Sequence, residues 1–132
     1  MLKTWKERMQ NDQFARHNGI EIVDADIGYA KTKMNVQPYH LNGVGIVHGG
    51  AIFTLADFAF AVAANSREQV AVAINISIAY IKAVKSGCVF AVAKEISYNP
   101  KLGIYQVDIF DESNELLATF QGMAYRKKSQ NT

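Results

Sequence analysis

The sequence predicts a single domain of the α+β class, in which a curved antiparallel β-sheet encloses one long helix. First, a chain of 132 residues with 49% hydrophobic residues suits one globular domain. Second, one internal segment is apolar on every side, and a helix of that kind has to be enclosed. Third, the segments that read as strands are joined by tight turns, which favour antiparallel neighbours. A sheet formed by these strands can enclose the apolar helix.

The first element is predicted to be an amphipathic helix over residues 3–16, because apolar residues recur there at helical spacing. Asn18-Gly19 follows as a stop signal. We therefore assign residues 1–17 to an N-terminal helix within the single domain, residues 1–132. Residues 127–132 follow the last predicted strand, and we expect them to form a flexible tail.

The segments after this helix alternate between apolar and polar residues, which is typical of strands. Residues 20–27 and 29–36 flank Gly28, so they are predicted to pair as a hairpin. A loop rich in glycine and asparagine leads to a second helix over residues 51–65. Four more strands are predicted at residues 70–81, 88–96, 104–110 and 116–125.

Composition argues against several classes of partner. The net charge is +2, and the basic cluster at residues 126–128 lies at the very end of the chain. Because binding to phosphate backbones needs a clustered basic face, we expect no nucleic-acid partner. Cys88 is the sole cysteine, which excludes an intrachain disulfide and fits a reducing cytoplasm, where we expect the protein. The three histidines lack cysteine partners at zinc-site spacing, so we expect no metal.

The richest apolar run is too short for a membrane span. It covers residues 51–64, is interrupted by Thr54 and Asp57, and falls short of the roughly 20 residues that a span needs. The N-terminal residues lack the apolar core of a signal peptide. We expect no membrane association.

Asp57 is the most unusual residue of the second helix. Its helical neighbours include Phe53, Phe58 and Phe60. A carboxylate in such surroundings is costly unless it is paired, and aspartate is a poor residue inside a helix. Asp57 therefore either caps or pairs with a loop donor, or has a chemical role, which we favour.

The start of the same helix, His48-Gly49-Gly50, is the second unusual feature. Helix N-termini carry unpaired N–H groups and the positive end of the dipole, and glycine lets a ligand approach the backbone closely. Donors aimed at a developing oxyanion stabilise it. A tight turn into the helix is the alternative explanation, but the combination with Asp57 favours an active site.

The segment from Asn42 to Asn65, with its core His-Gly-Gly-Ala-Ile-Phe-Thr-Leu-Ala-Asp, resembles hotdog-fold acyl-CoA thioesterases of the phenylacetate-pathway (PaaI-like) type. The order of elements matches over nearly the whole chain. The resemblance implies a hotdog fold and hydrolysis of acyl-CoA thioesters. It also implies that no metal or other cofactor takes part, since coenzyme A is part of the substrate.

The resemblance also implies roles for individual residues. Asp57 matches the catalytic carboxylate, as a general base for water or, alternatively, a nucleophile. Gly49 matches the N–H that polarises the thioester carbonyl, Asn42 matches a loop side chain that helps to hold it, and His48 orders the loop. Substrate-binding candidates are Gly50, Phe53, Asn75, Ser77 and Lys82, of which Asn75 and Ser77 could position the water. Phe53, Phe58 and Tyr39 could line an apolar acyl pocket.

The spacing of Gly49 and Asp57 predicts a site shared between chains. Eight residues of one helix correspond to roughly 12 Å, whereas groups that act on one carbon come within about 3–3.5 Å. We therefore expect Gly49 of one subunit to act with Asp57 of another in a homodimer, and two such dimers to form a homotetramer.

Two other functions remain open at this stage. A hotdog-fold dehydratase or hydratase would use His48 and Asp57 to move protons on the acyl chain. A non-catalytic protein that binds acyl-CoA would keep the pocket without needing Asp57. The main prediction is an acyl-CoA thioesterase that acts on an aryl or medium-chain acyl group by carboxylate-assisted attack of water.

Overall fold

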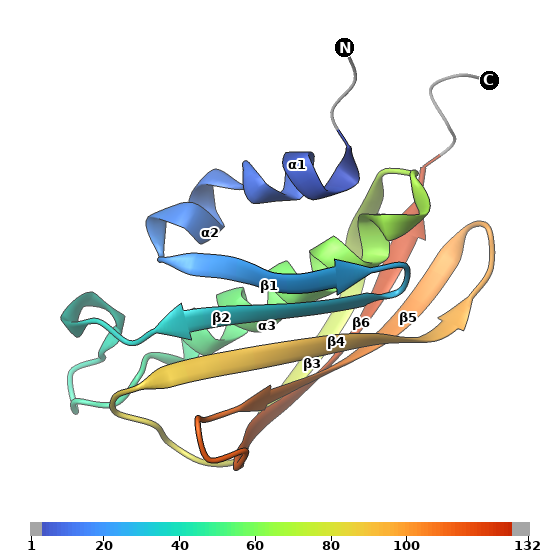
Figure 1. The fold of residues 1–132 in the computed structure, drawn as a ribbon. Helices are drawn as coiled ribbons and strands as arrows, with labels where there is room; N and C mark the ends of the chain where they lie inside the picture. Colours follow the sequence, from blue (N-terminus) through green and yellow to red (C-terminus); the bar gives the residue numbers. More distant parts are fainter. Residues whose placement is uncertain (1–3, 128–132) are drawn as a thin grey trace.

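The computed structural model describes residues 4–127 and shows a six-stranded sheet curved around one long helix (Figure 1). The strand order is β1-β2-β4-β5-β6-β3, and every neighbouring pair is antiparallel. The strands are β1 (Ile20–Asp26), β2 (Tyr29–Asn35), β3 (Ala71–Tyr80), β4 (Cys88–Tyr98), β5 (Leu102–Phe110) and β6 (Leu116–Arg126). The predicted α+β class and the hotdog arrangement are confirmed.

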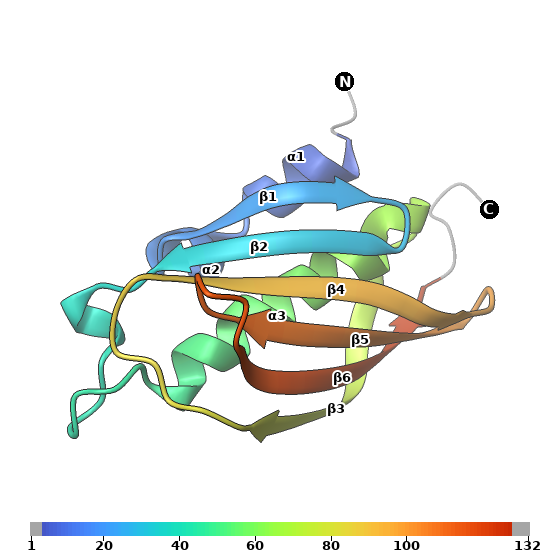
Figure 2. The same ribbon diagram turned by 60° about the horizontal axis from the view of Figure 1, so that its bottom comes forward.

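The long helix, α3 (Gly49–Ala64), crosses the concave face of the sheet (Figure 2). Leu55, Ala59 and Val62 are fully buried, because strands β2, β4 and β5 pack against the helix. A short 3₁₀ turn, η2 (Asn65–Arg67), extends it. Residues 49–67 have the length and apolar composition that a membrane span also has, but most of them are buried inside the domain. The sheet, together with the N-terminal residues that also pack against the helix, therefore explains why most of its faces are apolar.

The N-terminal segment differs from the prediction. One helix over residues 3–16 is wrong, because the structure has α1 (Trp5–Gln10) and α2 (Gln13–His17) instead. The break falls at Asn11 and Asp12, and the Asp12 carboxylate accepts a hydrogen bond of 2.9 Å from the Ala15 N–H. Asparagine and aspartate bond to nearby backbone and favour helix ends over helix interiors.

The predicted tail, residues 127–132, lies largely outside the described residues. Lys127 is described, and its N–H donates a hydrogen bond of 2.8 Å to the carbonyl of Val70. Lys127 therefore continues the pairing of β6 with β3 by one residue and does not belong to a free tail.

Another 3₁₀ turn, η1 (Pro38–His40), lies in the loop before α3. The buried His40 ring accepts from the Gln37 N–H at 2.9 Å and contacts the carbonyl of Asn18 at 2.8 Å. The His40 carbonyl in turn accepts a hydrogen bond of 2.7 Å from the His48 N–H. This chain of contacts fixes the loop against the start of α3.

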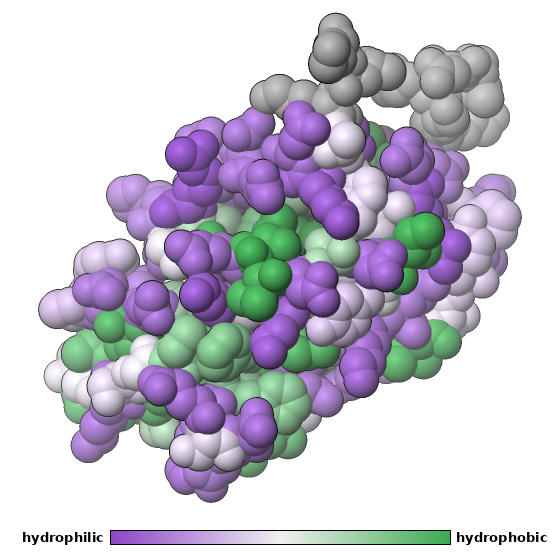
Figure 3. Space-filling view, viewed as in Figure 1, coloured by the Kyte–Doolittle hydropathy of each residue, from purple (hydrophilic) through white to green (hydrophobic). Residues whose placement is uncertain are grey.

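Strand β3 forms one edge of the sheet and pairs with β6 alone. Apolar side chains are unusually accessible along and just beyond it, including Ile74 (54% exposed), Tyr80 (54%) and Ile81 (57%). On the face shown in Figure 3, hydrophilic residues predominate over α1 and α2, and hydrophobic ones form separate spots. Single apolar residues on a surface are ordinary, whereas an open edge strand can pair with another chain.

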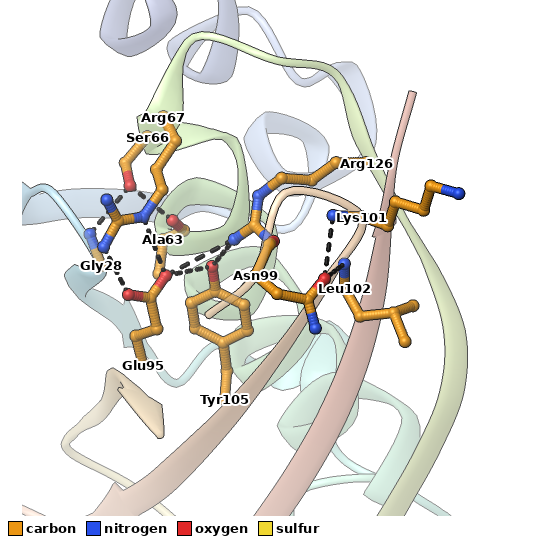
Figure 4. A network of polar contacts seen from close by, with 10 residues as sticks. All are labelled: Gly28, Ala63, Ser66, Arg67, Glu95, Asn99, Lys101, Leu102, Tyr105 and Arg126. Atoms are coloured by element: carbon orange, nitrogen blue, oxygen red, sulfur yellow. Dashed lines mark hydrogen bonds and ion pairs between the residues drawn. The ribbon is translucent and has the colours of Figure 1, made fainter. Parts of the chain in front are cut away.

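The end of α3 that lies opposite its first turn is surrounded by a buried polar network (Figure 4). Glu95 binds Arg67 at 2.6 Å, accepts a hydrogen bond of 2.7 Å from the Tyr105 hydroxyl, and contacts Arg126 at 3.4 Å. The side chain of Arg126 is fully buried, and it donates to the Tyr105 hydroxyl at 2.5 Å and to the Asn99 carbonyl at 3.1 Å. The network joins η2 to strands β4, β5 and β6.

Candidate functional site

The first turn of α3 leaves one backbone donor free. A helix begins with four N–H groups that have no helical acceptor. The Nδ1 atom of His48 accepts from the Gly50 N–H at 2.8 Å, and the His48 carbonyl accepts from Ala51 and Ile52 at 2.9 and 3.3 Å. The Gly49 N–H has no acceptor among residues 4–127. The predicted polarising group is therefore the one that the helix cap leaves available.

Asn42 organises the loop that leads to this turn. Its side-chain oxygen accepts from the N–H groups of Val44 and Ile46 at 3.0 and 3.3 Å, and its own N–H donates to the Ile46 carbonyl at 2.8 Å. The side-chain NH₂ of Asn42 has no acceptor within the described part of the chain. Asn42 and Gly49 line the same cavity of about 240 Å³. The structure thus brings these two predicted residues together.

Lys82 reaches this cavity as well. Its ammonium group pairs with the carboxylate of Glu115, and both side chains are half exposed. Lys82 therefore provides a positive charge near Gly49, partly compensated by Glu115. The apolar part of the cavity wall comes from the loop before α3, from α3, from the loop after β3 and from β6: Ile46, Val47, Ile52, Ile81, Ala83, Val84 and Leu117.

Asp57 lies two turns further along α3 and is partly buried. No hydrogen bond or ion pair joins its carboxylate to another described residue, so the alternative of a loop donor has no support. Burial raises the pKa of this carboxyl group, and the negative charge of Asp12 raises it further. A raised pKa makes a carboxylate a stronger base than a free aspartate, which suits Asp57 to accepting a proton from water.

Gly49 and Asp57 belong to one unbroken helix. Their separation along the axis is therefore roughly 12 Å. A single chain does not bring the free N–H and the carboxylate to one thioester carbon.

A second cavity, of about 430 Å³, lies on the other side of the helix start. Phe14 from α2, Tyr39 from η1 and Phe53 from α3 line it, and so do His48 and Gly50. Three aromatic rings beside polar backbone suit a flat apolar group.

The two phenylalanines proposed for the acyl pocket are separated by the fold. Phe53 lines the second cavity, with its ring centroid 5.7 Å from that of Phe120. Phe58 is 5% exposed and belongs to the core. The position of Phe58 therefore differs from our expectation, because it faces the packed side of α3.

The structure does not bring Asn75 and Ser77 to Gly49 or Asp57 of the same chain. Ser77 lies opposite Gln121, on the sheet face that points away from α3. It borders a shallow polar pocket there with Gln106 and Thr119. Asn75 is exposed next to an irregularity in the pairing of β3 with β6. Side chains alternate between the faces of a strand, so Ile76 and Ile78 take the inward positions instead.

Sequence reasoning missed Tyr80 and Asp12. Tyr80, the last residue of β3, donates a hydrogen bond of 2.9 Å from its hydroxyl to the Gly49 carbonyl. The alternation that turns Ile76 and Ile78 inward also turns Tyr80 inward, so the pattern contained a signal for it. Nothing in the local sequence links Asp12 to Asp57, because packing of the N-terminal helices on α3 creates that proximity.

Side chains that could bind a metal ion do not cluster in the described part of the chain. Within residues 4–127, no three side chains of histidine, cysteine, aspartate or glutamate lie close enough together to hold a metal ion. The chemistry that the described groups can perform is donation of hydrogen bonds to an oxygen by Gly49 and Asn42 and proton transfer by Asp57.

Comparison with known proteins identifies the family of the chain. The model of the thioesterase superfamily matches residues 44–118, which include the helix start and Asp57. A protein of Archaeoglobus fulgidus is 40% identical over 126 residues, covering 91% of this chain and 82% of the relative. The acyl-coenzyme A thioesterase PaaI of Escherichia coli is 33% identical, covering 94% of this chain and 91% of the relative.

Solved structures show the same likeness in three dimensions. The structure of the E. coli PaaI protein matches with a TM-score of 0.90 and 32% identity over 94% of this chain and 91% of that one. The TT0310 protein of Thermus thermophilus matches with a TM-score of 0.85 and 33% identity over 89% of this chain and 99% of that one.

Proposed function

Because this chain belongs to the thioesterase superfamily and is a thioester hydrolase, we propose that its substrate is an acyl-CoA with an aryl or medium-chain acyl group. The observation that carries the proposal is the free N–H of Gly49 beside a cavity at the start of α3. Two relatives support the substrate class. One is named acyl-coenzyme A thioesterase, and another, from Listeria monocytogenes, is named 1,4-dihydroxy-2-naphthoyl-CoA hydrolase.

In the proposed mechanism, the thioester carbonyl oxygen accepts hydrogen bonds from the Gly49 N–H and the Asn42 amide. The carboxylate of Asp57 takes a proton from water as the water oxygen attacks the carbonyl carbon. The negative charge that develops on the carbonyl oxygen is stabilised by donors that are already oriented. Collapse of the tetrahedral intermediate breaks the C–S bond, and the CoA sulfur leaves with the proton from Asp57. No cofactor is required.

His48 supports this reaction by capping the helix rather than by transferring a proton. Its Nδ1 atom accepts from the Gly50 N–H, so the neutral ring carries its proton on Nε2 and keeps no free basic nitrogen to take a proton from an acyl chain, as a dehydratase would require. We therefore favour hydrolysis over hydration or dehydration.

We place the complete site between two copies of the chain. Asp57 of one copy would act with Gly49 of the other, since one helix separates the two groups by roughly 12 Å. The exposed apolar residues along the open edge of β3 support an association with a second copy. A two-fold dimer would then contain two sites, and a dimer of dimers would contain four.

The cavity lined by Phe14, Tyr39 and Phe53 is our candidate for the acyl group. Its aromatic lining favours an aryl ring, which stacks on such side chains better than a short aliphatic chain does. Lys82, at the other cavity, would contribute positive charge toward the phosphates of coenzyme A.

The proposal is tested by release of free thiol from a panel of acyl-CoAs that runs from short aliphatic to phenylacetyl and hydroxybenzoyl thioesters. The Asp57→Ala variant serves as the inactive enzyme, and Asp24→Ala, which removes an exposed carboxylate on β1, is the matched control. We expect turnover of aryl or medium-chain substrates by the wild type and the control. Thiol release at the background rate for the whole panel would refute the proposed substrate class.

A further inference from the structure

We propose that Tyr80 is a positioning residue for the thioesterase reaction, which holds Gly49 so that its N–H points toward the substrate carbonyl. This inference rests on the proposed function and concerns the orientation of the donor rather than its identity.

Two contacts join Tyr80 to Gly49. The tyrosine hydroxyl donates a hydrogen bond of 2.9 Å to the Gly49 carbonyl oxygen. The ring lies against the glycine, since a Cβ atom added to Gly49 would be 3.3 Å from both Cζ and Oη of Tyr80. Tyr80 therefore contacts Gly49 through both the polar and the apolar part of its side chain.

These contacts complete the restraint of one peptide plane. The N–H of Gly49 belongs to the peptide between His48 and Gly49, whose orientation depends on the backbone torsions on either side. The carbonyl of that same peptide accepts from the N–H groups of Ala51 and Ile52 at 2.9 and 3.3 Å, and on one side the His48 N–H donates to the His40 carbonyl at 2.7 Å. On the other side, glycine lacks a side chain and is the residue most free to rotate. Tyr80 adds a restraint on that side, at the Gly49 carbonyl.

The same side chain forms part of the substrate cavity. Tyr80 lines the cavity of about 240 Å³ together with Asn42 and Gly49. Its ring therefore lies where a substrate that bonds to the Gly49 N–H would pass, although the hydroxyl itself points to the Gly49 carbonyl rather than to the substrate.

The position of Tyr80 argues against a role in folding alone. It is the last residue of an edge strand and is 54% exposed. Its hydroxyl binds a carbonyl in the first turn of a helix whose fold is secured by burial of the remaining turns. Loss of one exposed, neutral hydrogen bond changes stability little, whereas misorientation of a transition-state donor reduces the rate of the chemical step directly.

The test compares Tyr80→Phe with Tyr125→Phe, which removes the hydroxyl of a tyrosine on the outer face of β6. For Tyr80→Phe we expect kcat to fall by about fivefold with KM changed by less than about twofold, because the lost bond acts mainly in the transition state. The thermal unfolding midpoint should match that of Tyr125→Phe. Equal kcat values for the two variants would overturn the inference, and so would a fall in kcat that tracks a fall in the unfolding midpoint.

A second measurement tests whether Tyr80 acts through Gly49. In a Gly49→Ala background the added methyl group displaces the ring, so Tyr80→Phe should cost less there than in the wild type. Additive effects would contradict the inference. Asp57→Asn is measured in parallel, because full activity of that variant would refute the proposed function itself, whereas an inactive Asp57→Asn with a normal Tyr80→Phe would refute only the role of Tyr80.

Discussion

Polar side chains around the C-terminal end of α3 have hydrogen-bond partners, whereas two polar groups at its start and its middle do not. Around its C-terminal end, Glu95 is bound by two arginines and a tyrosine hydroxyl, and the ring of Tyr98 packs against the guanidinium groups of Arg67 and Arg126 at 3.9 and 4.5 Å. At its N-terminal end the Gly49 N–H has no partner among residues 4–127, and neither does the Asp57 carboxylate at the middle of the helix. Paired groups support the fold, and the two unpaired groups are available for chemistry.

The pKa values of the two carboxyl groups follow this difference. Burial disfavours the charged form of both. At Glu95 the hydrogen bonds from Arg67 and Tyr105 outweigh burial and lower the pKa, whereas at Asp57 burial acts unopposed and Asp12 adds to it. The Tyr105 hydroxyl, which burial and Glu95 keep protonated by raising its pKa, remains a donor in the network. Burial alone does not distinguish a structural carboxylate from a reactive one. The hydrogen-bond partners of the carboxylate do.

The largest expected effect is at the unpaired carboxylate. Asp57→Asn keeps the shape of the side chain and removes the base, so kcat should fall by about 10²–10⁴, the usual contribution of general base catalysis. Steady-state kinetics on the best acyl-CoA of the panel measures this fall. Near-wild-type turnover in a folded Asp57→Asn protein would contradict the assignment of Asp57 as the general base.

The same variant should be more stable than the wild type at neutral pH. Because the pKa of Asp57 is raised in the folded state, the ionised carboxylate costs stability above that pKa, and the wild type gains stability as the pH falls toward it. The difference in unfolding midpoint should therefore shrink on acidification.

The second effect concerns the paired end. Arg126→Leu leaves Glu95 with fewer donors in a buried site, and removal of one partner from such a network costs roughly 3 kcal/mol. Urea unfolding should show this loss, while kcat per folded molecule stays near the wild-type value. Lys94→Leu, at an exposed position on β4, is the control for removal of a positive charge. A loss of kcat that exceeds the loss of stability would show that the two ends are not separate in function.

The smallest effect is a shift in pH dependence. Asp12→Asn keeps a side-chain oxygen that can cap α2 and removes the negative charge that raises the pKa of Asp57. The pKa of Asp57 should then fall, and the acidic limb of the kcat profile should move to lower pH, since the active form is the carboxylate. An unchanged profile would show that burial alone sets the pKa of Asp57.

The sequence predicted the features that depend on local patterns. All six strands and the position of α3 follow from alternation, turn residues and an apolar run that requires cover. Asp57 and the glycines were recognisable because they conflict with their surroundings. The break between α1 and α2 was missed, although Asn11 and Asp12 are residues that favour helix ends.

The remaining features depend on contacts between distant segments. Tyr80 lies 31 residues from Gly49, and Glu95 lies 28 residues from Arg67. Alternation along β3 could indicate that Tyr80 points inward, but no local pattern identifies the partner of either residue. The placement of Ser77 on the outer face follows from the register of β3 against β6, which a one-residue shift would reverse. Pairing register and side-chain partners are therefore what the structure adds.

The central claim is that the free N–H and the unpaired carboxylate, which one helix keeps apart, meet between two chains. Gly49→Val, which blocks approach to the N–H, and Asp57→Asn are each expected to be nearly inactive. A mixed dimer of the two variants would contain one site with both defects and one intact site. Equal amounts of the two proteins with free subunit exchange should therefore recover about a quarter of the wild-type activity, by two-fold symmetry. No recovery despite verified exchange would contradict the account.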